Sequence, residues 1–137
     1  MDEYAHNVVQ VIVYRWAPTL QYLVLRRSEQ DGGWWQSVTG HSELGEAERD
    51  AALREINEEI GIEKLKYLSD PIFANTIEGG GQGFVYMAEV GRSEAVVLSA
   101  EHTEYRWADL STALNLLKYE GNKKNMRRAD ALLAEAR

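Results

Sequence analysis

The residues best suited to chemistry lie in one acidic segment, between positions 42 and 63. In this segment eight carboxylates stand against two arginines, which accounts for −6 of the net charge of −7. The acids are Glu43, Glu46, Glu48, Asp50, Glu55, Glu58, Glu59 and Glu63. Carboxylates this dense raise one another's pKa unless a cation lies among them. The segment therefore indicates either a cation site or a solvated acidic helix face.

Residues 46–60 are predicted to form the helix that positions these acids. At about 100° per residue, Glu59 lies near +40° and Glu58 near −60° from Glu55, so the three carboxylates share one face. Ala51 and Ala52 lie beneath that face and leave space above the preceding turn. The larger apolar residues fall on another face and are expected to point into the core, namely Leu53, Ile56 and Ile60.

The chemistry that suits this acidic face is the binding of Mg²⁺. Carboxylate oxygen is the hard ligand that Mg²⁺ prefers, and Mg²⁺ usually binds few protein groups while sharing phosphate oxygens with a substrate. Arg54 adjoins the face, and its guanidinium is expected to hold Glu55 or Glu58 in place. Spacing alone leaves both a metal site and a merely acidic helix open.

The elements that must hold this helix are mostly strands, as apolar and β-branched runs indicate. The expected strands are 8–14, 20–25, 34–38, 65–68, 72–77, 84–90 and 104–107, and the later helices run from a cap at Asp109 or Ser111 to Leu117 and over 122–136. The glycine-rich stretch 78–83 is expected to be a hairpin turn, because no helix follows it to complete a phosphate cradle. This order predicts an α+β fold, a mixed sheet with helices packed on it, and not a doubly wound α/β sheet.

Composition narrows the class of protein. The 137 residues suit one domain, 1–137, and the absence of cysteine excludes disulfides, thiol nucleophiles and cysteine-bound metals. No apolar run approaches the ~20 residues that span a bilayer, and the first residues lack the features of a signal peptide. The expected location is therefore the cytoplasm, with no membrane partner. The acidic charge disfavours a nucleic acid duplex as partner, and the oligomeric state is left open.

One segment resembles the signature of a known family. Gly40, then five residues, Glu46, then seven residues, and the run Arg54-Glu55-Ile56-Asn57-Glu58-Glu59-Ile60-Gly61-Ile62 are similar to the signature of the Nudix hydrolases. The resemblance implies an α/β/α sandwich with a mixed sheet. It also implies an enzyme that hydrolyses a nucleoside diphosphate linked to another group, with Mg²⁺ as cofactor and Mn²⁺ able to substitute.

The resemblance implies roles for particular residues. Glu55, Glu58 and Glu59 would hold the metal, together with the backbone carbonyl near Gly40. Glu58 or Glu59 would accept the proton of the attacking water, although some members of the family use a base outside the signature. Glu46 would orient Arg54 or the loop before the helix.

Segments outside the signature suggest a small-molecule substrate. Residues 34–40 and 101–107 resemble those of the dihydroneopterin triphosphate pyrophosphatases, which produce a monophosphate and pyrophosphate. By this resemblance Arg26 and Thr39 contact the substrate, Glu101 reaches the metal from the opposite wall, and Trp34 is the candidate for stacking on a ring. Residues 101–107 and Tyr119 also resemble the asymmetric diadenosine tetraphosphate hydrolases, which produce ATP and AMP. A non-catalytic nucleotide sensor is the third hypothesis.

Overall fold

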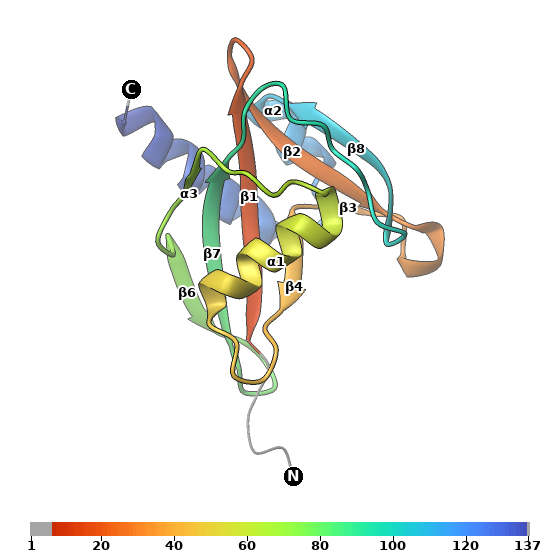
Figure 1. The fold of residues 1–137 in the computed structure, drawn as a ribbon, viewed down its shortest axis with the longest axis vertical. Coiled ribbons are helices and arrows are strands. Elements are labelled where there is room, and N and C mark those ends of the chain that lie inside the picture. Colours follow the sequence, from red (N-terminus) through yellow and green to blue (C-terminus); the bar gives the residue numbers. More distant parts are fainter. Residues whose placement is uncertain (1–6, 137) are drawn as a thin grey trace.

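The structure is a computed structural model, and it describes residues 7–136. The first residues, on which the expectation about a signal peptide rests, lie outside the described part. The elements are β1 (Val8–Trp16), β2 (Leu20–Arg27), the short 3₁₀ helix η1 (Glu29–Asp31), β3 (Trp35–Gln36), β4 (Val38–His41), α1 (Glu48–Ile60), β5 (Tyr67–Leu68), β6 (Phe73–Thr76), β7 (Gln82–Glu89), β8 (His102–Ala108), α2 (Leu110–Leu116) and α3 (Glu120–Glu135). Figure 1 shows α1 and α3 on opposite sides of the strands.

The strands form one mixed sheet, as the sequence predicts, although it has eight strands within residues 7–136 and not the seven expected. Its central pair, β1 and β7, is parallel, whereas β1 pairs with β2 and β7 pairs with β5 and β6 in antiparallel fashion. The stretch 78–83 is the hairpin turn between β6 and β7, closed by the hydrogen bond from the Ile77 N–H to the Gly81 carbonyl at 2.9 Å. The α/β/α arrangement is confirmed.

The sheet splits at Ser37, and this split creates the edge beside α1. The expected single strand over 34–38 is two short strands, because the chain changes partner there. β3 pairs with β2, through Leu25 and Gln36, while β4 pairs with the beginning of β1, through Val9 and Gly40. β4 consequently presents Thr39 and Gly40 next to α1.

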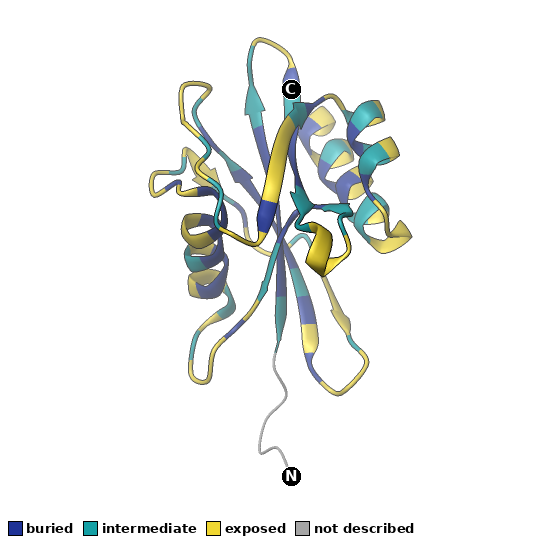
Figure 2. Cartoon of the chain, turned by 90° about the vertical axis from the view of Figure 1, so that its right-hand side faces the viewer, coloured by how far each residue is buried: buried dark blue, intermediate teal, exposed yellow. Residues whose placement is uncertain are grey.

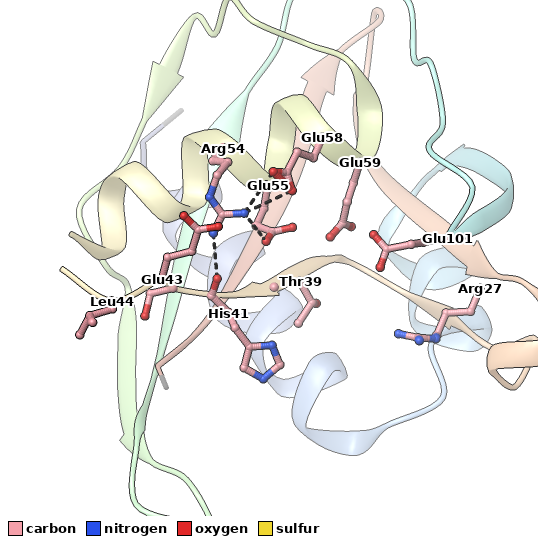
Figure 3. A pocket seen from close by; sticks show the side chains of 12 residues that line it. Arg27, Thr39, His41, Glu43, Leu44, Arg54, Glu55, Glu58, Glu59 and Glu101 are labelled. Carbon is pink, nitrogen blue, oxygen red and sulfur yellow. Dashed lines mark hydrogen bonds and ion pairs between the residues drawn. The ribbon is translucent and has the colours of Figure 1, made fainter. Parts of the chain in front are cut away.

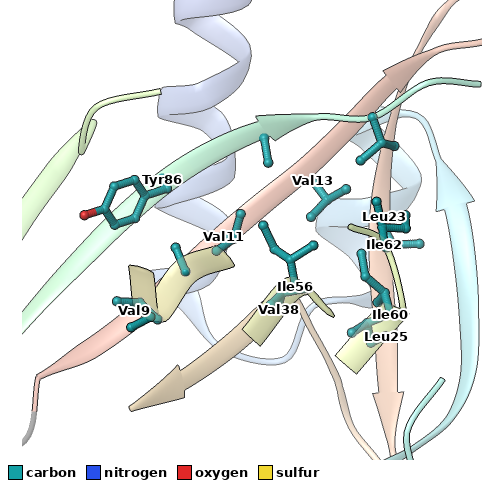
Figure 4. Close-up of a cluster of buried hydrophobic side chains, with 14 residues drawn as sticks. Val9, Val11, Val13, Leu23, Leu25, Val38, Ile56, Ile60, Ile62 and Tyr86 are labelled. Atoms are coloured by element: carbon teal, nitrogen blue, oxygen red, sulfur yellow. The ribbon is translucent and has the colours of Figure 1, made fainter. Parts of the chain in front are cut away.

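Alternation along β1 divides the apolar residues between two cores, one on each face of the sheet. Val9, Val11 and Val13 pack with Ile56 and Ile60 of α1, as Figure 4 shows. Ile12 and Tyr14 point to the opposite face and belong to the other core, together with Met126, Ala129 and Leu133 of α3. Figure 2 shows the buried side of α1 turned toward the strands.

The helix α1 differs from its prediction at two positions. It begins at Glu48 and not at Glu46, because the Glu46 carboxylate binds Arg54 and the backbone N–H of Glu43 in the preceding loop. Leu53, expected in the core, is 41% exposed, whereas Ala51 and Ala52 are fully buried. The two small alanines let α1 approach the sheet on their side, so the contact is rotated away from Leu53.

The end of α1 and the beginning of α2 lie where the sequence predicts their capping residues. Gly61 caps α1 in the left-handed conformation at φ 69°. Asp109 caps α2, where its carboxylate accepts the Thr112 N–H at 2.8 Å. Within residues 7–136 the structure contains no helix with the length and apolar character needed to cross a membrane.

Candidate functional site

An open pocket of about 650 Å³ lies where α1, β4 and the segment before β8 meet. Its lining combines carboxylates with two arginines and the backbone of β4, and Figure 3 shows the carboxylates of Glu59 and Glu101 turned toward each other, with Glu55 nearby. The lining residues are Arg27, Thr39, Gly40, His41, Ser42, Glu43, Leu44, Arg54, Glu55, Glu58, Glu59 and Glu101. The pocket therefore brings together the predicted metal ligands, Arg54 and Thr39.

Arg54 organises the carboxylates at one side of the pocket. Its guanidinium donates to both Glu46 oxygens, at 2.9 and 3.0 Å, and to the His41 carbonyl at 2.8 Å. It also donates to Glu55 at 3.0 Å and to Glu58 at 3.2 Å. The pairing with Glu46 is the bidentate form that fixes a guanidinium plane. The structure thus brings Arg54 into contact with Glu46 on one side and with the helix carboxylates on the other.

The approach of β4 to α1 and the shape of the loop before α1 each depend on a glycine. A Cβ atom at Gly40 would overlap the Glu55 carboxylate, although the backbone at Gly40 is not left-handed. Gly45 lies at φ 79°, a conformation that L side chains rarely adopt. The first glycine admits a carboxylate next to β4, and the second shapes the loop that delivers Glu46.

Glu59 is the most deeply buried acid of the site. It is 2% exposed, and its Oε1 atom has no hydrogen-bond partner among the described residues. Leaving a buried charged oxygen without a partner costs several kcal/mol. This carboxyl must therefore hold a proton or face a cation.

Electrostatics support that conclusion. Burial, then a hydrogen bond and charge repulsion from Glu55, raises the pKa of Glu59 to about 9, and a hydrogen bond from the Thr39 backbone opposes the shift. Burial also raises the pKa of Glu55, although the hydrogen bond with Glu59 and the charge of Arg54 act in the other direction. Both shifts disfavour two charged carboxylates side by side in the absence of a cation.

Glu101 reaches the pocket from the wall opposite α1. The Ser99 N–H donates to the Glu59 carbonyl at 3.3 Å, which fastens the segment before β8 to the end of α1. On the other side, the Ser28 N–H donates to the Glu101 carbonyl at 3.1 Å. These bonds hold the Glu101 carboxylate toward Glu59, as Figure 3 shows.

The donor set fits a hard divalent cation that is shared with a phosphate. The side chains that could hold it are the carboxylates of Glu55, Glu58, Glu59 and Glu101, and Glu59 already offers an unpartnered buried oxygen. Among residues 7–136, no three acidic or histidine side chains form a ready-made metal cage. Mg²⁺ does not need one, because it commonly takes one or two carboxylates plus phosphate oxygens and water.

Two of the predicted substrate residues lie outside the pocket lining. Arg26 donates to the Glu104 carboxylate at 2.8 Å and to the Gly33 carbonyl at 3.0 Å, and the following residue, Arg27, lines the pocket instead. The physical reason is the alternation along β2. Leu23 and Leu25 belong to the core under α1, whereas Tyr22 and Val24 belong to the other core. Arg27 therefore continues on the face of the pocket, and Arg26 lies on the opposite face.

Trp34, the second of these residues, belongs to an aromatic cluster that adjoins Arg27. Its ring meets Tyr119 edge to face, with centroids 5.8 Å apart, and the Lys118 ammonium lies 4.4 Å from its centroid. The Arg27 guanidinium lies 5.7 Å from the same ring. The cluster is thus connected to the pocket through Arg27.

Comparisons with known proteins agree with this geometry. The model of the NUDIX domain family matches residues 6–129. The chain is 33% identical over 123 residues to an octanoyltransferase of Myxococcus xanthus, but this match covers 83% of the chain and 33% of that protein, so the chain spans about a third of its length. It is 25% identical to the dihydroneopterin triphosphate diphosphatase of Escherichia coli strain K12, covering 90% of this chain and 92% of that one.

A third relative is the asymmetrical bis(5'-nucleosyl)-tetraphosphatase of Rattus norvegicus, 30% identical over 84% of this chain and 82% of its own. Among solved structures, the binary complex of the C. elegans Ap4A hydrolase matches with a TM-score of 0.80 and 27% identity, over 93% of this chain and 98% of that one. The E. coli dihydroneopterin triphosphate pyrophosphohydrolase matches with a TM-score of 0.75 and 27% identity, over 89% and 92%.

Proposed function

This chain belongs to the Nudix family and is a hydrolase of phosphoanhydride substrates, and from that premise we propose that it cleaves dihydroneopterin triphosphate to the monophosphate and pyrophosphate. The proposal is supported by the E. coli relative of that activity, which matches nearly the whole chain. It is supported also by the resemblance of residues 34–40 and 101–107.

One observation carries the reaction type: the buried Glu59 oxygen without a partner among the described residues, which lies in a pocket with four further carboxylates. We propose Glu55, Glu58, Glu59 and Glu101 as the side chains that hold Mg²⁺ or Mn²⁺, with the Gly40 carbonyl. When bound, such an ion neutralises pyrophosphate charge and lowers the pKa of a water that attacks phosphorus.

The protein's own groups then have separate tasks. Glu58 or Glu59 accepts the proton of the attacking water, as each is a carboxylate that lines the pocket. Arg54, held by both Glu46 oxygens, keeps the helix carboxylates in register with the His41 carbonyl. Arg27 supplies a fork of donors for the phosphate chain, and Thr39 lies at the pocket wall for contact with the substrate.

A second candidate substrate is diadenosine tetraphosphate, cleaved to ATP and AMP. The specific observation in its favour is the aromatic pair Trp34 and Tyr119 beside Arg27, since such a pair offers a stacking surface for an adenine. The nematode and rat relatives with the corresponding names agree with this alternative.

The deciding experiment compares kcat/KM for the two substrates at one Mg²⁺ concentration, with the products resolved by mass in H₂¹⁸O. We expect hydrolysis that stops in excess EDTA and returns with Mg²⁺, with the pterin substrate ahead. A tenfold preference for diadenosine tetraphosphate would overturn the pterin assignment and retain the reaction class. Binding of both substrates without any turnover would favour the nucleotide sensor.

A further inference from the structure

The strand β8 is the longest strand at an edge of the sheet. Within residues 7–136 it pairs with β2 only, whereas β1, β2 and β7 have strands on both sides and the remaining strands are short. Its pairing with β2 runs in unbroken register from Glu104 to Ala108. No loop of the described chain makes a backbone hydrogen bond to residues 103–107. Alternate backbone groups of β8 therefore point away from the sheet without a partner strand.

The side chains along this edge are exposed. In Figure 2 the strand lies in front of the others, and residues 103–106 are all exposed. Tyr105 is in register with Leu25, which belongs to the core under α1, so the tyrosine lies on the α1 face and is 44% exposed. Glu104 and Arg106 lie on the opposite face, because Arg106 is in register with Val24 of the other core.

The two charges of this face differ in how they are paired. The Glu104 carboxylate accepts a hydrogen bond from Arg26, directly across from it on β2, at 2.8 Å, and its side chain remains 52% exposed. The charge of Arg106 acts on Asp109, but its guanidinium forms no hydrogen bond or ion pair with any described residue. The edge therefore offers a cation without a partner beside a carboxylate that can accept further bonds.

The order of residues on this edge complements itself in reverse. When two copies of β8 lie antiparallel with Tyr105 opposite Tyr105, Glu104 of each chain lies opposite Arg106 of the other. The neighbouring registers that keep the same faces together place Glu104 opposite Glu104, or Arg106 opposite Arg106. Like charges directly opposite one another repel, whereas opposite charges attract. Of these registers, the one centred on Tyr105 alone matches the charges.

We propose that β8 binds a second copy of this chain edge to edge, across a two-fold axis at Tyr105, so that the two sheets become continuous. Main-chain hydrogen bonds between the two strands supply the attraction, and the two Glu104–Arg106 pairs select the register. Arg26 extends each pair into a row of three alternating charges, because it already binds Glu104. The self-complementary order identifies the occupant as a second copy and not an unrelated extended peptide.

The test is sedimentation velocity of the full chain at low ionic strength, from about 10 μM to about 1 mM. The wild type should shift from the mass of one chain toward twice that mass. Glu104→Lys and Arg106→Glu should each weaken association at least about tenfold, because each places like charges opposite one another. Mixed in equal amounts, the two variants should associate with each other as the wild type does, since each supplies the charges that the other lacks.

Two matched controls reverse exposed charges away from β8, namely Glu63→Lys and Arg127→Glu, and both should associate like the wild type. Circular dichroism shows whether each variant is folded. Amide hydrogen exchange of the wild type gives a measurement that needs no variant, and exchange should slow with rising concentration at residues 103–107.

Three results would overturn the proposal: a wild type that is still monomeric at about 1 mM, a folded charge-reversed variant that dimerises as well as the wild type, or a mixture of the folded variants that stays monomeric. Concentration-dependent protection that leaves residues 103–107 unchanged would also overturn it. Because these measurements need neither metal nor turnover, their failure would leave the hydrolytic function unaffected.

Discussion

The helices α1 and α3 cover opposite faces of one sheet but use their buried positions differently. α3 buries Met126, Ala129 and Leu133 and leaves its cations, such as Arg127, in solvent. α1 buries two glutamates among its alanines and isoleucines.

The difference shows which position of the fold lowers its free energy of unfolding. A cation on the outside of α3 costs almost nothing, whereas the Glu59 carboxyl inside α1 loses its hydration and gains no partner at Oε1. Packing alone would select an apolar residue there. The carboxylate face is therefore explained by what it binds, and the face of α3 by packing.

The largest effect should come from neutralising the carboxylates of α1, since α3 buries no such group. Glu59→Gln and Glu58→Gln should each lower kcat by at least ~10²-fold, since each removes a metal ligand or a base. Glu63→Gln, just beyond α1 and exposed, is the matched control and should retain kcat. If both first variants keep near wild-type kcat at saturating Mg²⁺, the carboxylate site is assigned wrongly.

The next effect tests what the helices share. Ile56→Ala on α1 and Met126→Ala on α3 remove side chains that are 1% and 0% exposed, so each should cost ~2–5 kcal/mol of unfolding free energy. Urea denaturation measures both. A loss below about 1 kcal/mol for one helix only would show that its packing contributes less than its burial indicates.

A smaller effect is the pH dependence of the free energy of unfolding, to which Glu59 of α1 contributes. The native Glu59 carboxyl keeps its proton to about pH 9, whereas the unfolded one loses it near 4.5, so stability falls as pH rises between these values. The slope is at most ~1.4 kcal/mol per pH unit. Denaturation in EDTA at pH 7 and 8.5 should show this decline in the wild type and not in Glu59→Gln.

Measuring above pH 7 separates the contribution of Glu59 to stability from that of His102. Burial lowers the pKa of His102 below 6.5, so its contribution to stability is lost only as pH falls through the acidic range. A decline of the same size in Glu59→Gln would assign the pH dependence to another group.

The smallest effect concerns Leu53. Because this residue is 41% exposed and alanine favours a helix, Leu53→Ala should change the unfolding free energy by no more than about 0.5 kcal/mol. Comparing the two losses of unfolding free energy, for Leu53→Ala and Ile56→Ala, shows where the buried face of α1 ends. A loss above about 2 kcal/mol would return Leu53 to the core.

The sequence predicted the elements well because local signals determine them, as the caps Gly61 and Asp109 illustrate. It predicted the acidic face because helical spacing brings Glu55, Glu58 and Glu59 together without knowledge of the rest of the fold. It failed for Leu53, since a helical wheel shows which residues are apolar and not how far a helix is rotated on its sheet.

The division of 34–38 into two strands was missed because it depends on long-range pairing, namely on the change of partner at Ser37. This change leaves no local mark in the residues concerned. The choice of Arg26 was a different error, because alternation from Leu23 and Leu25 places Arg27 on the face of α1.

The overlap of any Gly40 side chain with Glu55 also limits how this sequence can drift. The backbone of Gly40 would accept other residues, so its restriction comes from the neighbouring carboxylate and not from its own conformation. In a complete survey of substitutions, a side chain at position 40 should be accepted only where Glu55 moves aside or is replaced by a shorter residue. The residues accepted at position 40 therefore depend on the residue at position 55, whereas position 55 can become shorter while Gly40 is retained.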